Sequence, residues 1–137
     1  MNDDPDVDRG TETVLIVEDE LAVRELVTDI LVSAGYTVRP AGNGVEALAL
    51  LAQHVGPVHL VLSDVVMPEM SGPSLAARLA SVRPEIRVLF MSGYADDEIL
   101  RHGLEAQSHS LLNKPFSVSE LRRAVRAALD SPDGKRR

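Results

Sequence analysis

Residues 58–68 constrain the fold more than any other part of the chain. They form an apolar run rich in Val and Leu, polar only at His59 and Ser63 before it reaches the carboxylate of Asp64, and Pro68 stops it. A run that is apolar at successive positions is typical of a strand buried on both faces, as in the centre of a parallel sheet. A single acid at the carboxyl end of such a strand lies where open α/β sheets bind their ligands.

Four more short apolar runs alternate with segments of helical periodicity. The predicted strands are residues 13–17, 36–40, the run that ends on Asp64, 86–91 and 109–113. Pro40 favours an edge position for the second strand, because proline cannot donate to a neighbouring strand. Strands that alternate with helices over short connections predict right-handed βαβ units and a five-stranded parallel sheet covered on both faces, an α/β fold.

Helix boundaries are predicted by capping residues and by apolar spacing. Gly35 ends the first helix, Asn43 opens the second, Ser71 caps the third, and Ser117 begins a capping box. Residues 95–101 are expected to form a short, weak helix, followed by a loop over 102–108. The helix positions expected to face the core are Val23, Leu26, Val27, Ile30, Leu31, Ala34, Val45, Leu48, Leu51, Ala52, Leu75, Ala76, Leu79, Val82, Val118, Leu121, Ala124, Val125, Ala128 and Leu129.

Length and charge limit the classes of function. The 137 residues suffice for one domain, expected over 13–129, with a disordered leader at 1–12 and a disordered tail at 130–137. The chain has no cysteine, no signal-peptide pattern and no apolar run long enough for a membrane span, so we expect a cytoplasmic protein that does not bind membranes. A net charge of -7 argues against nucleic-acid binding by this domain.

Polar residues follow four of the predicted strands. Glu18 and Asp19 come after the first strand, Asp64 ends the third, Ser92 follows the fourth and Lys114 follows the fifth. The carboxyl ends of parallel strands share one edge, so these groups are expected to meet there. Clustered carboxylates suit Mg²⁺, and the lysine and hydroxyl suit a small dianion, which points to phosphoryl transfer onto the Asp64 carboxylate.

The motifs Glu18-Asp19, Asp64 to Pro68, Ser92-Gly93 and Lys114-Pro115-Phe116 resemble the receiver domain of two-component response regulators, most closely the receivers of hybrid sensor histidine kinases. The resemblance covers about residues 13–129 and implies a flavodoxin-like (βα)5 fold with strand order 2-1-3-4-5.

This resemblance also implies a role for each residue of the site. Asp64 would be the phosphoacceptor, with Ser92 and Lys114 binding the phosphoryl group. Asp19, Asp64 and the backbone carbonyl of Val66 would bind Mg²⁺, and Glu18 would act on the metal through water. The bond before Pro115 would be cis. The phosphodonor would be a histidine kinase or a histidine phosphotransfer protein, and the receiver would be a monomer or a dimer formed on phosphorylation.

The residue at the switch position departs from the family pattern. Leu111 stands where many receivers carry an aromatic switch residue, and Tyr94 is a hypothetical substitute.

The resemblance would also place a docking surface for the donor on the first helix, at Leu21, Arg24 and Glu25, and output on the face of the fourth helix, fifth strand and fifth helix.

Other functions remain open at this stage. A protein-interaction module of the same fold that is not phosphorylated is the main alternative. An aspartyl phosphohydrolase is disfavoured because Val66 stands where such enzymes carry a second acid, so no enzyme activity beyond self-catalysed phosphotransfer and slow autodephosphorylation is expected. Flavin binding is disfavoured because three acids, Glu18 to Glu20, fill the loop that would hold a phosphate. No output domain follows Leu129 in this sequence, and we expect a stand-alone regulator or a receiver from a longer kinase.

Overall fold

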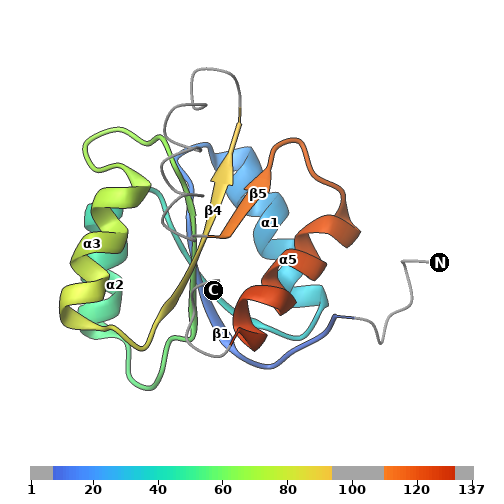
Figure 1. The fold of residues 1–137 in the computed structure, drawn as a ribbon, viewed down its shortest axis with the longest axis horizontal. Coiled ribbons are helices and arrows are strands. Elements are labelled where there is room, and N and C mark those ends of the chain that lie inside the picture. The colour runs from blue at the N-terminus through green and yellow to red at the C-terminus, as the bar shows by residue number, and fades with distance from the viewer. Residues whose placement is uncertain (1–7, 94–109, 132–137) are drawn as a thin grey trace.

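The computed structural model describes residues 8–93 and 110–131, which form a parallel sheet with helices on both faces (Figure 1). Its strands are β1 (Thr13–Val17), β2 (Thr37–Ala41), β3 (Leu60–Asp64), β4 (Arg87–Ser92) and β5 (Ser110–Asn113). The described helices are α1 (Leu21–Ser33), α2 (Gly44–Gln53), α3 (Gly72–Val82) and α5 (Val118–Asp130). The helix expected at 95–101, the loop at 102–108, Tyr94 and the tail beyond 131 lie outside the described residues.

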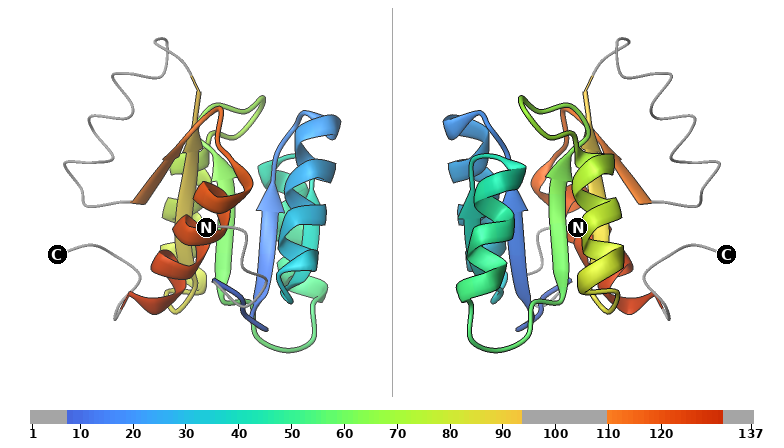
Figure 2. Two further views of the ribbon diagram at one scale, coloured as in Figure 1. Left: turned by 90° about the vertical axis from the view of Figure 1, so that its right-hand side faces the viewer. Right: turned by 90° about the vertical axis from the view of Figure 1, so that its left-hand side faces the viewer.

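The strand order is β2-β1-β3-β4-β5 with every pair parallel, which confirms the predicted sheet. In Figure 1, α1 and α5 cover one face and α2 and α3 cover the other. Figure 2 shows β1 and β3 side by side and pointing the same way. All five residues of the central strand β3 are buried, as the apolar run predicts, and Asp64 is its last residue.

Local signals placed the helix ends correctly. The side chains of Asn43, Ser71 and Ser117 each accept a hydrogen bond from the backbone amide three residues later, and Glu120 completes the capping box at the start of α5. Gly35 follows α1 with φ at 106°, a conformation that favours glycine. No described helix is both long and apolar enough to cross a membrane.

Several expected core positions instead face solvent. A helix turns 100° per residue, so adjacent side chains point in different directions: on α1, Val27 is turned inward and buried, whereas Leu26 is 55% exposed. Val45 is exposed for the same reason beside buried Gly44. Three other positions expected to face the core are also exposed, and all lie near helix ends: Ala52 near the end of α2, Val82 at the end of α3 and Val118 at the start of α5.

Residues 8–12 contact the folded domain, although the sequence assigns them to the leader. The Arg126 guanidinium on α5 binds the Glu12 carboxylate at 2.6 Å and the Asp130 carboxylate at 3.0 Å, and it donates to the Tyr36 hydroxyl. The hydrogen bond from Arg126 holds the pKa of Glu12 below its ordinary value. Arg126 therefore ties the segment before β1 to α5 and to the start of β2.

We predict that Arg126→Ala lowers the free energy of unfolding by about 1–3 kcal/mol, because it leaves the partly buried Glu12 carboxylate without its donor. Arg126→Lys should recover only part of this loss, since one ammonium cannot reproduce the planar guanidinium fork. Urea unfolding followed by far-UV circular dichroism measures both.

The matched control is Arg123→Ala, which removes an exposed arginine from the same helix. Its expected effect is within about 0.5 kcal/mol of wild type. An equally small effect for Arg126→Ala would show that the contacts of Arg126 do not stabilise the fold.

Candidate functional site

A cavity of about 470 Å³ opens at the edge of the sheet where the strands end. One part of its wall is charged, and the other part is apolar. The charged part comprises Glu18, Asp19, Glu20, Asp64 and Lys114, and the remaining lining residues are Val23, Leu26, Val66, Met91, Gly93, Pro115 and Phe116. The cavity thus places a polar site beside an apolar surface that reaches the first turns of α1.

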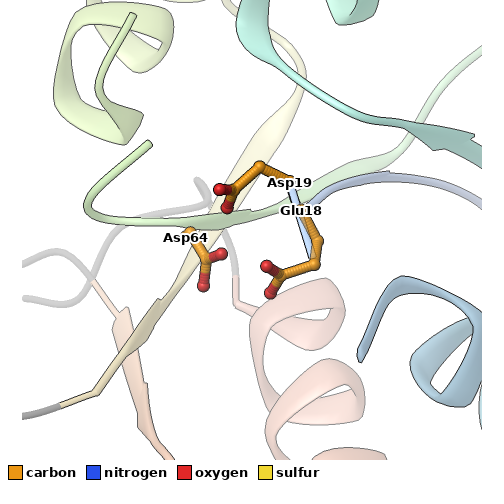
Figure 3. Close-up of side chains that lie close together, drawn as sticks. All are labelled: Glu18, Asp19 and Asp64. Carbon is orange, nitrogen blue, oxygen red and sulfur yellow. The ribbon is translucent and has the colours of Figure 1, made fainter. Parts of the chain in front are cut away.

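Three carboxylates converge on this cavity, as predicted. Oxygen atoms of Glu18, Asp19 and Asp64 all lie within 4.8 Å of one another. Figure 3 shows them coming from two separate segments, the end of β1 and the end of β3. Glu18 and Asp64 are buried, whereas Asp19 is exposed. This arrangement offers a cation one open ligand and two that are shielded from water.

Lys114 supplies the positive charge at the centre of the site. Its Nζ lies 2.6 Å from Asp64 Oδ1 and 3.1 Å from Glu18 Oε1. Its backbone amide donates to the Ser92 carbonyl at 2.8 Å, which fixes the turn after β5 against the end of β4. The Lys114–Pro115 peptide bond is cis, as the resemblance implies.

The backbone around Asp64 is held on both sides. The Val65 amide donates to the Met91 carbonyl at 3.0 Å, and the Gly72 amide donates to the Val65 carbonyl at 2.9 Å. A Cβ at Gly72 would collide with the Asp64 carbonyl oxygen. Glycine is therefore required for the start of α3 to approach β3 this closely.

Burial and neighbouring charge set the protonation of the site. Burial first, and the Glu18 carboxyl second, raise the pKa of Asp64 from 3.8 to about 8, against the opposing effect of Lys114. Burial would also raise the pKa of Glu18, but hydrogen bonds with Asp64, the Glu20 amide and Lys114 outweigh it and lower that pKa. For Lys114, the bonds to both acids overcome burial and raise the pKa. Of the two buried acids, Asp64 therefore has the raised pKa and Glu18 the lowered one.

Ser92 and Val66 also lie at this edge of the sheet. The Ser92 side chain is fully buried, and its Oγ has no hydrogen-bond partner in the described part of the chain. Ser92 is not among the residues that line the cavity, although Met91 and Gly93 on either side of it are. Val66 lines the cavity. The roles predicted for the Ser92 hydroxyl and the Val66 carbonyl remain predictions.

The position of the expected aromatic switch is occupied by a smaller side chain. Leu111 is half-buried and packs against the cluster formed by Val65 and Phe90. Tyr94, the hypothetical substitute, lies outside the described residues.

Sequence reasoning missed two features of the site. Arg24, expected on a docking surface, also donates from Nη1 to the Glu18 carbonyl at 2.7 Å, a contact within the site that the sequence did not indicate. The apolar wall formed by Val23, Leu26, Pro115 and Phe116 was not foreseen. The motif Lys114-Pro115-Phe116 was visible in the sequence, but only the fold shows that it faces α1.

Comparison with known proteins settles the family. The model of the response regulator receiver domain matches residues 14–126. The chain belongs to the response regulator receiver family. Its five parallel strands in the order 2-1-3-4-5 and its acidic pocket, typical of phosphoacceptor sites, agree with this membership.

Particular receivers are similar over nearly the whole chain. The sensor kinase CckA of Brucella abortus is 45% identical over 124 residues, which are 90% of this chain and 13% of the kinase. The crystal structure of the receiver domain from the hybrid histidine kinase CckA is 30% identical with a TM-score of 0.70, covering 86% of this chain and 99% of that one. The predicted similarity to receivers of hybrid kinases is confirmed.

A further solved receiver carries ligands. The response regulator TrrA of Thermotoga maritima, in complex with Mg²⁺ and BeF, is 28% identical with a TM-score of 0.73, covering 85% of this chain and 98% of that one.

We predict that Asp64→Asn stabilises the metal-free receiver increasingly as the pH rises from 5 to 8. The folded state keeps a proton on Asp64 up to a pKa of about 8, whereas the unfolded chain releases it near 3.8. Between these values the folded state binds more protons, so wild-type stability falls as the pH rises. An asparagine does not titrate, so the advantage of the variant should reach about 1–3 kcal/mol at pH 8.

Urea unfolding in buffer with a chelator measures this difference at each pH. Asp29→Asn, which removes an exposed carboxylate from α1, is the control. A difference between Asp64→Asn and wild type that stays constant from pH 5 to 8 would contradict the assigned protonation.

Proposed function

We propose that this receiver accepts a phosphoryl group from a phosphohistidine onto Asp64, with Mg²⁺ bound at the carboxylate cluster, and that phosphorylation changes its binding to partners. One observation carries the proposal: the buried Asp64 carboxylate faces a cavity with the Lys114 ammonium 2.6 Å away, and at the end of the neighbouring strand the Ser92 hydroxyl has no partner among the described residues. A buried hydroxyl without a partner needs an acceptor, and a phosphoryl oxygen is one.

The three carboxylates fit a magnesium ion. Mg²⁺ prefers oxygen ligands, keeps several waters and is commonly shared with a phosphate. Asp19 and Asp64 would bind it directly with the Val66 carbonyl, and Glu18 would lie beside it. Such an ion would favour the ionised form of Asp64 and neutralise charge on the transferred oxygens. The complex of the related TrrA with Mg²⁺ and BeF supports this choice of metal.

The transfer needs little beyond position and charge. An Asp64 carboxylate oxygen attacks phosphorus, the P–O bond forms, and the P–N bond breaks with its electron pair returning to the imidazole. Lys114 can leave Glu18 and keep its contact with the modified Asp64, since its ammonium already lies between the two acids. A dianionic phosphoryl group would then hold Lys114 and Ser92 together and couple the ends of β3, β4 and β5.

The receiver is proposed to act as a switch and not as a turnover enzyme. The side chain two residues after Asp64 is Val66, which cannot act as a general acid or base. Hydrolysis of the acyl phosphate then depends on unassisted water, so autodephosphorylation is expected to be slow.

The apolar wall of the cavity is the proposed contact for the phosphodonor. Leu26 is 55% exposed and lies with Val23, Pro115 and Phe116 beside the acids. A donor that presents its histidine from an amphipathic helix could cover this wall while the imidazole reaches Asp64. A histidine kinase or a histidine phosphotransfer protein is the partner of that chemistry, consistent with the similarity to a sensor kinase.

We predict that acetyl phosphate with Mg²⁺ adds one phosphoryl group to the wild type and none to Asp64→Asn. Intact-mass spectrometry detects the added group, and peptide mapping locates it. Lys114→Ala should react about 100-fold more slowly, because it removes the cation that faces the developing charge.

Asp29→Asn is the matched control and should react like the wild type. Identical behaviour of wild type and Asp64→Asn would leave the alternative, a receiver-like interaction module that is not phosphorylated. Modification of both at another residue would likewise contradict Asp64 as the acceptor.

A further inference from the structure

Glu18 has a partner for every one of its hydrogen-bonding groups. Its amide donates to the Ala41 carbonyl at 3.1 Å, and its carboxylate accepts from Lys114 at 3.1 Å and from the Glu20 amide at 3.0 Å. Its carbonyl accepts from Arg24 Nη1 at 2.7 Å, the shortest of these contacts. The acid loop, defined as residues 18–20, is therefore held by a network in which Arg24 contributes a charged side chain from outside the loop that binds the loop backbone.

Arg24 also lies against the next loop of the sheet. A Cβ at Gly42 would meet the Arg24 guanidinium at 3.2 Å and the Glu46 carboxylate at 3.3 Å. That carboxylate accepts from the Gly42 amide. The guanidinium is thus packed between the acid loop and the start of α2, and it is half-buried rather than free on the surface of α1.

We propose that Arg24 is a positioning residue of the metal and phosphoryl site, an inference that rests on the proposed function. Two of the three carboxylates of the acid loop, those of Glu18 and Asp19, lie close to the Asp64 carboxylate, and the mutual repulsion of these groups favours moving the loop outward. Arg24 opposes this movement, because its charged guanidinium binds the carbonyl of the peptide bond that joins Glu18 to Asp19. Groups that orient metal ligands in this way commonly change metal affinity 10- to 100-fold when they are removed.

This role differs from docking of the phosphodonor, which the sequence suggested for Arg24. A docking residue affects transfer from a protein donor only. A positioning residue affects Mg²⁺ binding and transfer from any donor, including a small one with no protein surface. The two roles therefore separate with acetyl phosphate.

The test compares Arg24→Gln, Arg24→Lys and a matched control, Arg78→Gln, which removes an exposed arginine from α3. Isothermal titration calorimetry gives the Mg²⁺ dissociation constant, and intact-mass spectrometry gives the initial rate with acetyl phosphate. Circular dichroism confirms that each variant is folded at the temperature used. Arg24→Gln should bind Mg²⁺ about 10-fold more weakly and react correspondingly more slowly at limiting Mg²⁺. Arg24→Lys, which keeps a cationic donor, should recover most of the affinity, and Arg78→Gln should match the wild type.

Arg24→Gln that binds Mg²⁺ within twofold of wild type and reacts normally with acetyl phosphate would overturn the proposal, whatever its rate with a protein donor. Failure of the wild type itself to bind Mg²⁺ would contradict the proposed function instead. In that case amide hydrogen exchange tests the role of Arg24 independently of the metal. Arg24→Gln should speed exchange of the Glu20 amide, which donates a hydrogen bond to the Glu18 carboxylate, by about 10-fold. Unchanged exchange at Glu20 would overturn it.

Discussion

One ammonium group allows two buried carboxylates to share the end of a sheet. Like charges in a shielded site repel strongly, and without a cation one acid must take up a proton or move away. Lys114 lies within 3.1 Å of both Glu18 and Asp64, but burial first and the Glu18 carboxyl second still raise the pKa of Asp64. The site thus sets two buried carboxylates against one ammonium, and the Mg²⁺ ion of the proposed function would balance the second carboxylate.

The parallel sheet makes this arrangement possible. Its central strand β3 is buried throughout and delivers Asp64, while β1 and β5 end on either side of the same cavity. The close approach at Gly72 and the hydrogen bonds of Val65 fix the backbone of Asp64 from the α3 side. On the α1 side, Arg24 holds the backbone of Glu18. The ends of β1, β3 and β5 thus meet around Asp64, an arrangement that agrees with membership in the receiver family.

The sequence predicted the site residues that lie at the ends of strands. It missed the contacts that depend on the path of a long side chain or on the packing of a helix. Asp64, Glu18 and Lys114 could be placed together because parallel strands end at one edge. Arg24 could not, because its role depends on where a long side chain turns back toward a loop. Leu26 has the periodicity of a core residue, and only the packing of α1 beside Phe116 shows that it lines the site.

The most direct test of the account is a structure of the receiver with Mg²⁺ and beryllium fluoride, which imitates a phosphoryl group on a carboxylate. Beryllium is predicted on Asp64, with the Lys114 ammonium and the Ser92 hydroxyl within hydrogen-bonding distance of its fluorides and Mg²⁺ bound by Asp19. Beryllium fluoride bound elsewhere, or a Lys114 that keeps both carboxylate contacts while Asp64 stays unmodified, would contradict the central claim.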